Sequence, residues 1–475
     1  MSDSDLVVVL PGILGSTLLD AHGKEIWAPS ARAVLRAVRT FGDSIRKYRL
    51  PEDLGDDHPG DGIVPGRLMP DLHALPGIWT PVKGYDPLLA RLERMGYRQA
   101  SREQDAPPGN LLPVAYDWRL SNRYSGKRLA SIVEPALERW RAQGGRHADA
   151  QLVFVCHSMG GLVARWYVEQ RGGAELTRKL ITLGTPYRGA AKALDQLVNG
   201  VRKGLGKLAV DLTEFARTLP SLHQLVPEYA CLEHNGGWLK TGEYADATGR
   251  GIPGLSAERL ADAMRFHTQL AAAEVARPAS LDMTHMIVGV RQPTGTTVRI
   301  TSDGDAELSD TFGGDNDYGD ATVPLAGALG HQLTGDSNRI QRTSDHHGDL
   351  PRNLAALDEL ESVLTGRTIR RRDAAAVPLR VAVPDLLLAG EPLPVDITVD
   401  DASRHAIRIT ITGESREPEI RIPRLRQGHT TAVFTDLPPG AYTVDVTGLD
   451  PSSPLAPVSS DLIIWDPTQQ DPDGL

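Results

Sequence analysis

The feature that most constrains the fold of this chain is a strand–turn–helix pattern at residues 153–167, VFVCHSMGGLVARWY. An apolar run of strand type leads into a turn at Ser158, and apolar residues at helical spacing follow. Such a turn needs small residues, because the strand and the helix approach closely. Gly160 and Gly161 meet this need after the serine, and Cys156, which stands where a glycine is usual, is small enough to fit. The pattern therefore predicts a nucleophile elbow with Ser158 at its tip.

Short apolar runs alternate with helix-like segments through the first 365 residues, which is typical of a mostly parallel sheet covered by helices. The predicted strands are residues 6–10, 111–116, 152–156, 180–183 and 286–290, and the predicted helices are residues 86–97, 128–141 and 159–170. With the elbow, this alternation predicts an α/β-hydrolase domain over residues 1–365.

The segment from about residue 190 to residue 285 has a different pattern. It is amphipathic and helical with no strong strand signal, and its apolar positions are Leu194, Leu197, Val198, Val201, Leu205, Leu208 and Phe215. We predict a cap, or lid, inserted over the core, whose apolar face either docks on a membrane surface or is buried. The alternative interpretation is a set of ordinary helices that cover one face of the sheet.

The composition changes again after residue 365. Residues 366–376, GRTIRRRDAAA, are predicted to be a linker, with the arginines at 370–372 exposed to solvent. From residue 377 apolar residues recur at period two, separated by turn signals such as LPPG at 437–440. This alternation predicts an antiparallel β-sandwich of immunoglobulin-like type over residues 377–466, followed by a polar tail at 467–475.

Charge and cysteine content exclude several classes of protein. The 475 residues carry a formal net charge of −10 at pH 7, so the broad basic surface that nucleic-acid binding needs is missing. Cys156 and Cys231, the two cysteines, cannot form a disulfide framework. The N-terminus has no basic leader or cleavage site, and no apolar run approaches the roughly 20 residues of a membrane span. We therefore expect a cytoplasmic protein that can associate peripherally with a membrane.

A serine hydroxyl becomes a useful nucleophile when a histidine takes its proton and a carboxylate orients that histidine. In α/β-hydrolases these residues follow the chain order serine, carboxylate, histidine. YGDATVP at 318–324 supplies Asp320, and SDHHGDLP at 344–351 supplies either His346 or His347 as the base. His157, next to the serine on a tight turn, is interpreted as a packing or polar neighbour, and Cys156 as a residue that points beneath the turn.

Two backbone amides are needed to stabilise the oxyanion that forms during attack on an ester. One is predicted to be the amide of Met159, directly after the serine, and the other that of Ile13 in LPGILG at 10–15. No cofactor is expected. No metal is expected either, because the adjacent histidines and the acidic loop FGGDNDYGD at 312–320 match no zinc or calcium pattern.

Several motifs, in this order, resemble the lecithin:cholesterol acyltransferase family, which includes lysosomal phospholipase A2. They are VVVLPGILGSTLLD, VAYDWRL, CHSMGGLVARWY, LITLGTPYRGAAKA, TLPSLHQLVPEY, GDATVP and HHGDLP. The resemblance covers roughly residues 5–360. It implies that Ser158 is the nucleophile, Asp320 the acid, His347 rather than His346 the base, and Ile13 an oxyanion residue. It also implies that a lid follows GTPYRG. Asp117 and Arg119 of YDWR are expected to form a structural pair.

The sequence thus predicts a serine hydrolase or acyltransferase that acts on lipid esters, most simply of phospholipase A type. The β-sandwich, the missing signal peptide and the missing disulfides depart from the extracellular members of that family. One alternative is therefore a regulated effector, controlled by a protein partner that docks on the cap or on the C-terminal domain. A second alternative is a soluble carboxylesterase. A binding module without activity is disfavoured because every position of the predicted site is intact.

Overall fold

The computed structural model describes residues 4–27, 48–70, 84–100, 108–203, 210–278, 284–330, 339–367, 377–400, 405–413, 416–450 and 453–466. Within these residues the central sheet has the strand order β17-β12-β7-β6-β1-β5, and every neighbouring pair is parallel. Its strands are β1 (Leu6–Leu10), β5 (Leu111–Pro113), β6 (Leu152–His157), β7 (Thr177–Leu183), β12 (Thr284–Gly289) and β17 (Ile340–Thr343). This arrangement confirms the predicted α/β fold.

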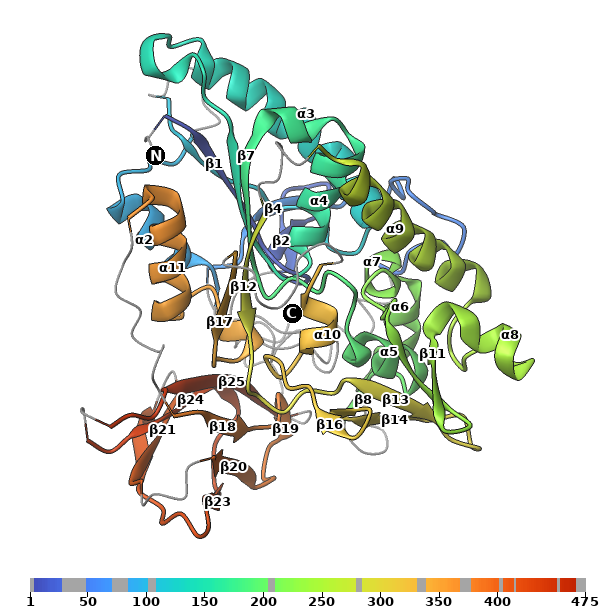
Figure 1. The fold of residues 1–475 in the computed structure, drawn as a ribbon, viewed down its shortest axis with the longest axis vertical. Coiled ribbons are helices and arrows are strands. Elements are labelled where there is room, and N and C mark those ends of the chain that lie inside the picture. The colour runs from blue at the N-terminus through green and yellow to red at the C-terminus, as the bar shows by residue number, and fades with distance from the viewer. Residues whose placement is uncertain are drawn as a thin grey trace.

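Helices cover both faces of this sheet (Figure 1). On one side lie α3 (Asn122–Arg141), α4 (Gly160–Gln170) and α9 (Ala257–Ala276), and on the other α2 (Asp86–Arg94) and α11 (Leu354–Thr365). Residues of β1 alternate between the two cores: Val8 packs with the α3 and α4 side, and Val7 with the α2 and α11 side. A strand buried on both faces explains why this run is apolar without interruption.

The chain makes two long excursions beyond the carboxyl ends of β7 and β12, which is where parallel α/β sheets place their sites. The first contains α5 (Ala191–Val198), α6 (Thr213–Thr218), α7 (Pro220–His223), α8 (Tyr244–Thr248) and the strands β8 (Arg202–Lys203), β9 (Val210–Asp211), β10 (Ala230–His234) and β11 (Gly237–Lys240). The second contains β13 (Thr297–Ile300), β14 (Ala306–Ser309), β15 (Thr311–Phe312), β16 (Asp315–Asn316) and α10 (Leu325–Ala328).

The two excursions meet in one small sheet of order β11-β10-β13-β14. The segment predicted to be a purely helical cap therefore contains strands, and its sheet is completed by residues beyond 285. Its last helix, α9, packs on α4 beside the central sheet, as the alternative interpretation expected. Leu205 and Leu208 of the predicted apolar face lie outside the described residues.

Near the N-terminus, β2 (Ser16–Leu19) pairs antiparallel with β3 (Glu25–Trp27) and β4 (Val64–Leu68). The predicted helix at 128–141 begins earlier, at Asn122, because the side chain of Ser121 caps it by accepting a hydrogen bond from the amide of Arg123.

The C-terminal region is a β-sandwich, as predicted. In the described residues one sheet has the order β18-β20-β23 and the other β19-β25-β24-β21-β22. The strands are β18 (Leu379–Ala382), β19 (Leu386–Leu388), β20 (Leu393–Val399), β21 (Ile407–Gly413), β22 (Arg416–Arg421), β23 (His429–Phe434), β24 (Gly440–Gly448) and β25 (Val458–Trp465). All pairs are antiparallel except β19 with β25, which are parallel. Most of the predicted linker, with its arginines, and the tail at 467–475 lie outside the described residues.

Candidate active site

Ser158 lies at the turn between β6 and α4 with a positive φ of 53°. A non-glycine residue holds such a conformation only when its surroundings enforce it. Here the amide of Ser158 donates to the carbonyl of Leu183 at 2.8 Å, and the hydroxyl of Thr185 donates to the carbonyl of Ser158 at 2.8 Å. The end of strand β7 and the loop after it thus hold both the amide and the carbonyl of Ser158 at the predicted elbow.

The glycines around the elbow are required by close backbone approach. A Cβ on Gly160 would lie 2.3 Å from the carbonyl oxygen of Pro11, and a Cβ on Gly161 would lie 2.1 Å from the hydroxyl of Thr185. A Cβ on Gly12 would lie 2.8 Å from the Cβ of Ser158. Cys156 is fully buried in the sheet, and burial raises the pKa of its thiol well above the usual value. A thiol that stays protonated is a poor nucleophile.

Ser158, His347 and Asp320 form one hydrogen-bonded series. The Oγ of Ser158 is 2.8 Å from Nε2 of His347, and Nδ1 of His347 is 2.8 Å from Oδ2 of Asp320. Oδ1 of Asp320 accepts hydrogen bonds from the amides of Thr322 and Val323 at 3.1 and 2.6 Å. A carboxylate only accepts, so Nδ1 of His347 carries the hydrogen and Nε2 is free to take the serine proton.

The structure distinguishes between the two candidate histidines. His347 begins a short 3-10 turn, η6 (His347–Asp349), and its ring contacts Ser158. The ring of His346 points elsewhere: its Nε2 donates to the carbonyl of Val381 in the β-sandwich at 2.9 Å. Burial lowers the pKa of His346, which therefore stays neutral and suits this single donated hydrogen bond.

The loop after β1 lies against the elbow, with Gly12 at Ser158 as described above. Among the described residues, the amides of Ile13 and Met159 donate no hydrogen bond. The neighbouring amide of Gly12 is occupied, because it donates to the hydroxyl of Tyr85 at 2.8 Å. Both predicted amides are thus available, and their role in holding an oxyanion stays a prediction.

Sequence reasoning missed a second series of hydrogen bonds behind the site. Tyr85 accepts from Gly12 and donates to Nδ1 of His157 at 2.9 Å, and Nε2 of His157 donates to the carbonyl of His347 at 3.0 Å. His157 is therefore the polar neighbour that the sequence suggested, with a partner on the histidine loop. No local sequence pattern indicates this role of Tyr85, because Tyr85 and His157 are 72 residues apart in the sequence.

Gly184, in the LITLGTPYRG motif, lies close to both His347 and Asp320. Its φ is 59°, and a Cβ there would lie 3.0 Å from Nδ1 of His347 and 3.1 Å from Oδ2 of Asp320. The predicted pair in YDWR is confirmed: Nη2 of Arg119 is 2.6 Å from Oδ2 of Asp117, and Nη1 of Arg119 is 2.9 Å from Asp61.

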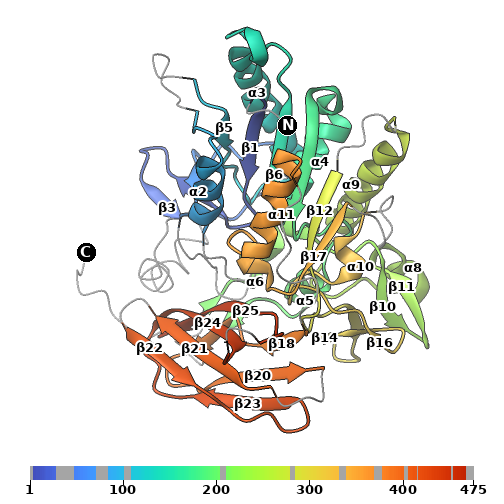
Figure 2. The ribbon, with the colours of Figure 1, turned by 60° about the vertical axis from the view of Figure 1, so that its left-hand side comes forward.

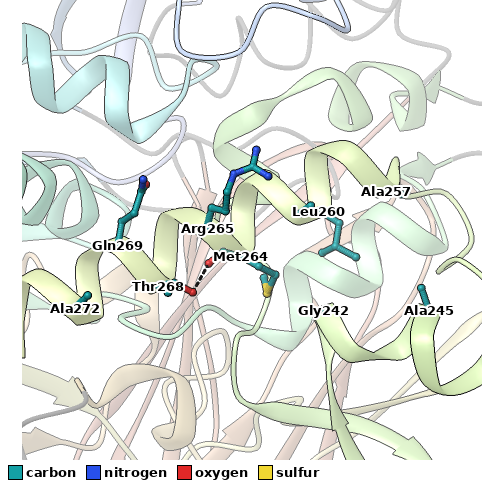
Figure 3. A pocket seen from close by; sticks show the side chains of 10 residues that line it. Gly242, Ala245, Ala257, Leu260, Met264, Arg265, Thr268, Gln269 and Ala272 are labelled. Atoms are coloured by element: carbon teal, nitrogen blue, oxygen red, sulfur yellow. Dashed lines mark hydrogen bonds between the residues drawn. The ribbon is translucent and has the colours of Figure 1, made fainter.

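Ser158 is 1% exposed and His347 is fully buried. A groove of about 640 Å³ opens elsewhere, along α9 and the turn before α8 (Figure 3). Small or apolar residues form most of its wall, including Gly242, Ala245, Leu260 and Met264. It shares no residue with the hydrogen-bonded series, and we assign it no part in the chemistry.

Two further observations concern ligands and membranes. In the described part of the chain, no group of three or more His, Cys, Asp or Glu side chains is placed to hold a metal ion. None of the helices in these residues is both long enough and apolar enough to cross a bilayer.

Comparison with known proteins supports the predicted family. Residues 80–248 match the sequence profile of the family described as lecithin:cholesterol acyltransferase. Lecithin-cholesterol acyltransferase-like 1 of Oryza sativa subsp. japonica is 27% identical over 239 residues, which are 44% of this chain and 50% of that protein. An uncharacterized protein of Saccharomyces cerevisiae is 30% identical over 185 residues, or 38% of this chain and 23% of that protein. The chain thus spans half or less of the length of these relatives.

Among solved structures, the mature form of the Bacillus licheniformis lipase BlEst2 aligns with 78% of this chain and 94% of its own. The identity is 13% and the TM-score 0.34, which does not establish a shared fold. The similarity to the family therefore rests on sequence, and the profile match over residues 80–248 includes the elbow and Ser158. Residues 80–248 of this chain are thus similar in sequence to the lecithin:cholesterol acyltransferase family.

Proposed function

We propose that the protein is a serine hydrolase or acyltransferase that acts on lipid esters through an acyl-enzyme on Ser158. The observation that carries this proposal is the continuous series Ser158 Oγ, His347 and Asp320, with both distances at 2.8 Å. The similarity of residues 80–248 to the lecithin:cholesterol acyltransferase family supports a lipid ester as the substrate. The finer proposal is phospholipase A-type cleavage of a glycerophospholipid.

The proposed reaction uses only side chains and amides already in place. His347 takes the proton of Ser158 as the serine oxygen attacks the ester carbonyl, and the amides of Ile13 and Met159 hold the oxyanion. The protonated His347 then gives its proton to the leaving alcohol. The acyl group passes next to water or to an acceptor alcohol, with His347 again acting as the base. Asp320 stabilises the imidazolium throughout.

The first test is the Ser158→Ala variant, assayed on p-nitrophenyl esters. Loss of a nucleophile in such a triad typically costs a factor of about 10⁶ in kcat, so turnover should fall to background. Ser125→Ala is the matched control, because Ser125 is a buried serine of α3 with no hydrogen bond to the triad side chains. Ester hydrolysis retained in Ser158→Ala would refute the assignment.

The substrate and the acceptor need a separate measurement. Wild type and Ser158→Ala are incubated with vesicles of mixed phospholipids, with and without a long-chain alcohol, and the lipids are analysed by mass spectrometry. Wild type should release lysophospholipid and fatty acid, and a fatty acyl ester of the alcohol if it is a transferase. Hydrolysis of p-nitrophenyl esters with no lipid product would favour a carboxylesterase instead.

A further inference from the structure

The β-sandwich lies directly against the end of the central sheet that carries the site (Figures 1 and 2). It contacts both loops of the proposed triad. The guanidinium of Arg380 in β18 lies over the ring of Tyr318, 4.4 Å from its centre, two residues before Asp320. On the histidine loop, His346 donates to Val381 of β18 at 2.9 Å, and the amide of Ser459 in β25 donates to Asp345 at 2.8 Å.

Gln292, in the loop after β12, joins these parts through a single buried side chain. Its backbone exchanges two hydrogen bonds of 3.0 Å with Gly319, the residue before Asp320. Its side-chain nitrogen donates to the carbonyls of Ser344 and Leu379, and its side-chain oxygen accepts from the amide of Val381 at 3.0 Å. Both side-chain amide hydrogens and the side-chain oxygen therefore have partners. Gln292 thus holds together the loop that carries Asp320, the loop that carries His347, and β18.

Asp345 fixes the histidine loop from its other side. Oδ1 accepts from Ser459 of the sandwich, and Oδ2 accepts from Nδ2 of Asn353 at 2.6 Å. Asn353 is also the N-cap of α11, where its side chain accepts from the amide of Ala356. The loop that carries His347 is thus anchored between the hydrolase helix and the sandwich, with little regular structure of its own.

We infer that the C-terminal β-sandwich helps to hold the active site in its productive geometry. Gln292 and His346 of the hydrolase loops, with Arg380 of β18, act as positioning residues for His347 and Asp320. The inference rests on the proposed function. Its physical basis is that a proton-transferring histidine must be held to a fraction of an ångström of its productive geometry. The hydrolase residues that contact the sandwich lie within three residues of His347 or Asp320 in the sequence. These contacts therefore restrict the conformations of the two loops that carry the triad residues.

The first experiment compares His346→Ala, His346→Gln and the control His285→Gln in the full chain. His285 is also a buried histidine with one hydrogen bond, to Glu359 at 2.9 Å, but it belongs to the far end of β12. His346→Ala should lower kcat for p-nitrophenyl esters by about 10- to 100-fold with KM little changed. His346→Gln should recover most of this loss, because a glutamine side chain can still donate to Val381.

Hydrogen exchange gives a readout that does not depend on activity. His346→Ala should raise the exchange rates of amides 344–349 and 318–320, whereas His285→Gln should leave them unchanged. If His346→Ala and His285→Gln lose the same activity, with no faster exchange in either loop, the inference is overturned while the proposed function stands. If the wild type hydrolyses no ester, the proposed function is overturned, and the inference with it.

A milder pair of variants covers the case in which His346→Ala does not fold. Arg380→Gln removes the contact with Tyr318, and Arg421→Gln removes a similar stacking contact, 4.3 Å from the centre of the Phe434 ring, within the sandwich itself. A cation–π contact of this kind corresponds to about a 2- to 5-fold effect. Arg380→Gln should lower kcat by that factor and Arg421→Gln should not; equal kcat values for the two would overturn the inference.

Discussion

At the scale of single residues, Tyr85 links three segments that are distant in the sequence. Its hydroxyl accepts from the amide of Gly12 beside the proposed oxyanion position, and donates to His157, whose other nitrogen reaches the carbonyl of His347. Burial raises the pKa of Tyr85, so the hydroxyl stays protonated and able to donate. One side chain therefore ties the oxyanion loop to the elbow and the histidine loop.

Replacement of Tyr85 by phenylalanine should be costly for stability. The change leaves a buried amide and a buried ring nitrogen without these partners, each at about 1–3 kcal/mol, so the free energy of unfolding should fall by about 2–6 kcal/mol. Tyr116→Phe is the control, because Tyr116 donates one hydrogen bond to the carbonyl of Pro11 in the same loop. Urea denaturation followed by circular dichroism measures both. A loss in Tyr85→Phe no larger than in Tyr116→Phe would contradict the linking role.

Gly184 allows the cost of backbone strain to be separated from the cost of crowding the site. Gly184→Ala would force a left-handed alanine, at about 1–2 kcal/mol, and would also press its Cβ against His347 and Asp320. Gly172→Ala should be destabilised by the same left-handed backbone, at φ 77°, but no atom lies within 4 Å of its added Cβ. Gly184→Ala should lose at least as much stability as Gly172→Ala in thermal unfolding, because its Cβ would also lie 2.7 Å from Cδ1 of Leu350, and only Gly184→Ala should lose esterase activity. Equal activity would show that the site tolerates the added methyl group.

At the scale of elements, α9 is fastened to α4 by a buried ion pair. Arg165 and Glu274 lie 2.7 Å apart with side chains 3% and 4% exposed, and the Arg165 guanidinium also lies 4.5 Å from the ring centre of Tyr187. Because α4 begins at Gly160, two residues after Ser158, this pair joins the helix behind the nucleophile to the last helix of the first excursion.

Removal of one partner from this pair should be strongly destabilising. Glu274→Ala leaves the Arg165 charge buried, and the free energy of unfolding should drop by about 3–5 kcal/mol. The double variant Arg165→Met with Glu274→Leu should recover a large part of that loss, since an apolar pair carries no uncompensated charge. Glu307→Ala, which breaks an exposed pair with Arg299, should change stability little. Chemical denaturation of the four proteins checks the order; equal losses in Glu274→Ala and Glu307→Ala would contradict it.

Elements were predictable where a local pattern specifies them. The strand Leu6–Leu10, the turn at Ser158 and the helix after it follow from apolar periodicity and small residues. The strand β17 and the strands of the first excursion were missed, because Ile340–Thr343 has mixed polarity and β10 and β11 are short and mostly at the surface. Their pairing depends on partners far along the chain, which a local pattern does not contain.

For the site, the chain order of motifs was enough to predict Ser158, Asp320 and a histidine at 346 or 347. It could not predict that His346 reaches across to Val381, or that Gln292 joins both loops to the sandwich. These contacts join residues of the hydrolase part to residues of the sandwich that are distant in the sequence. The sequence therefore predicted a β-sandwich without indicating what it touches.

At the scale of the whole molecule, the contact between hydrolase and sandwich buries an excess of carboxylates. Asp345, Asp349 and Asp461 gather there around one guanidinium, that of Arg352. Burial raises the pKa of Asp345 to about 6. Burial, with Asp461 close by, raises the pKa of Asp349 well above its usual value. Both acids thus hold their protons more tightly in the folded protein than in the unfolded chain.

Raised pKa values of this kind make the contact weaken as the pH rises. Below about pH 4 the two acids are protonated in both states, and their full contribution is present. Between about pH 4 and pH 6, Asp345 is ionised in the unfolded chain but protonated in the folded protein, so folding requires the uptake of a proton. The contribution of Asp345 is lost over that window, and that of Asp349 continues to fall at higher pH. Carboxylates elsewhere with lowered pKa values make a contribution to stability that increases with pH. The test therefore compares the pH dependence of a variant with that of the wild type.

Asp349→Asn supplies that difference, because asparagine resembles the protonated acid at every pH. Its oxygen can still accept from Arg352, and its amide replaces Oδ2, which has no hydrogen-bond partner among the described residues. Between about pH 5 and pH 8, the free energy of unfolding of Asp349→Asn should increase progressively relative to that of the wild type. Asp358→Asn, which breaks the ion pair with Arg91 on the outer helices, should show no such gain. Urea denaturation at several pH values measures both differences. A constant offset between Asp349→Asn and wild type would mean that Asp349 keeps one protonation state across this range, and that the contact between the domains is not weakened by its ionisation.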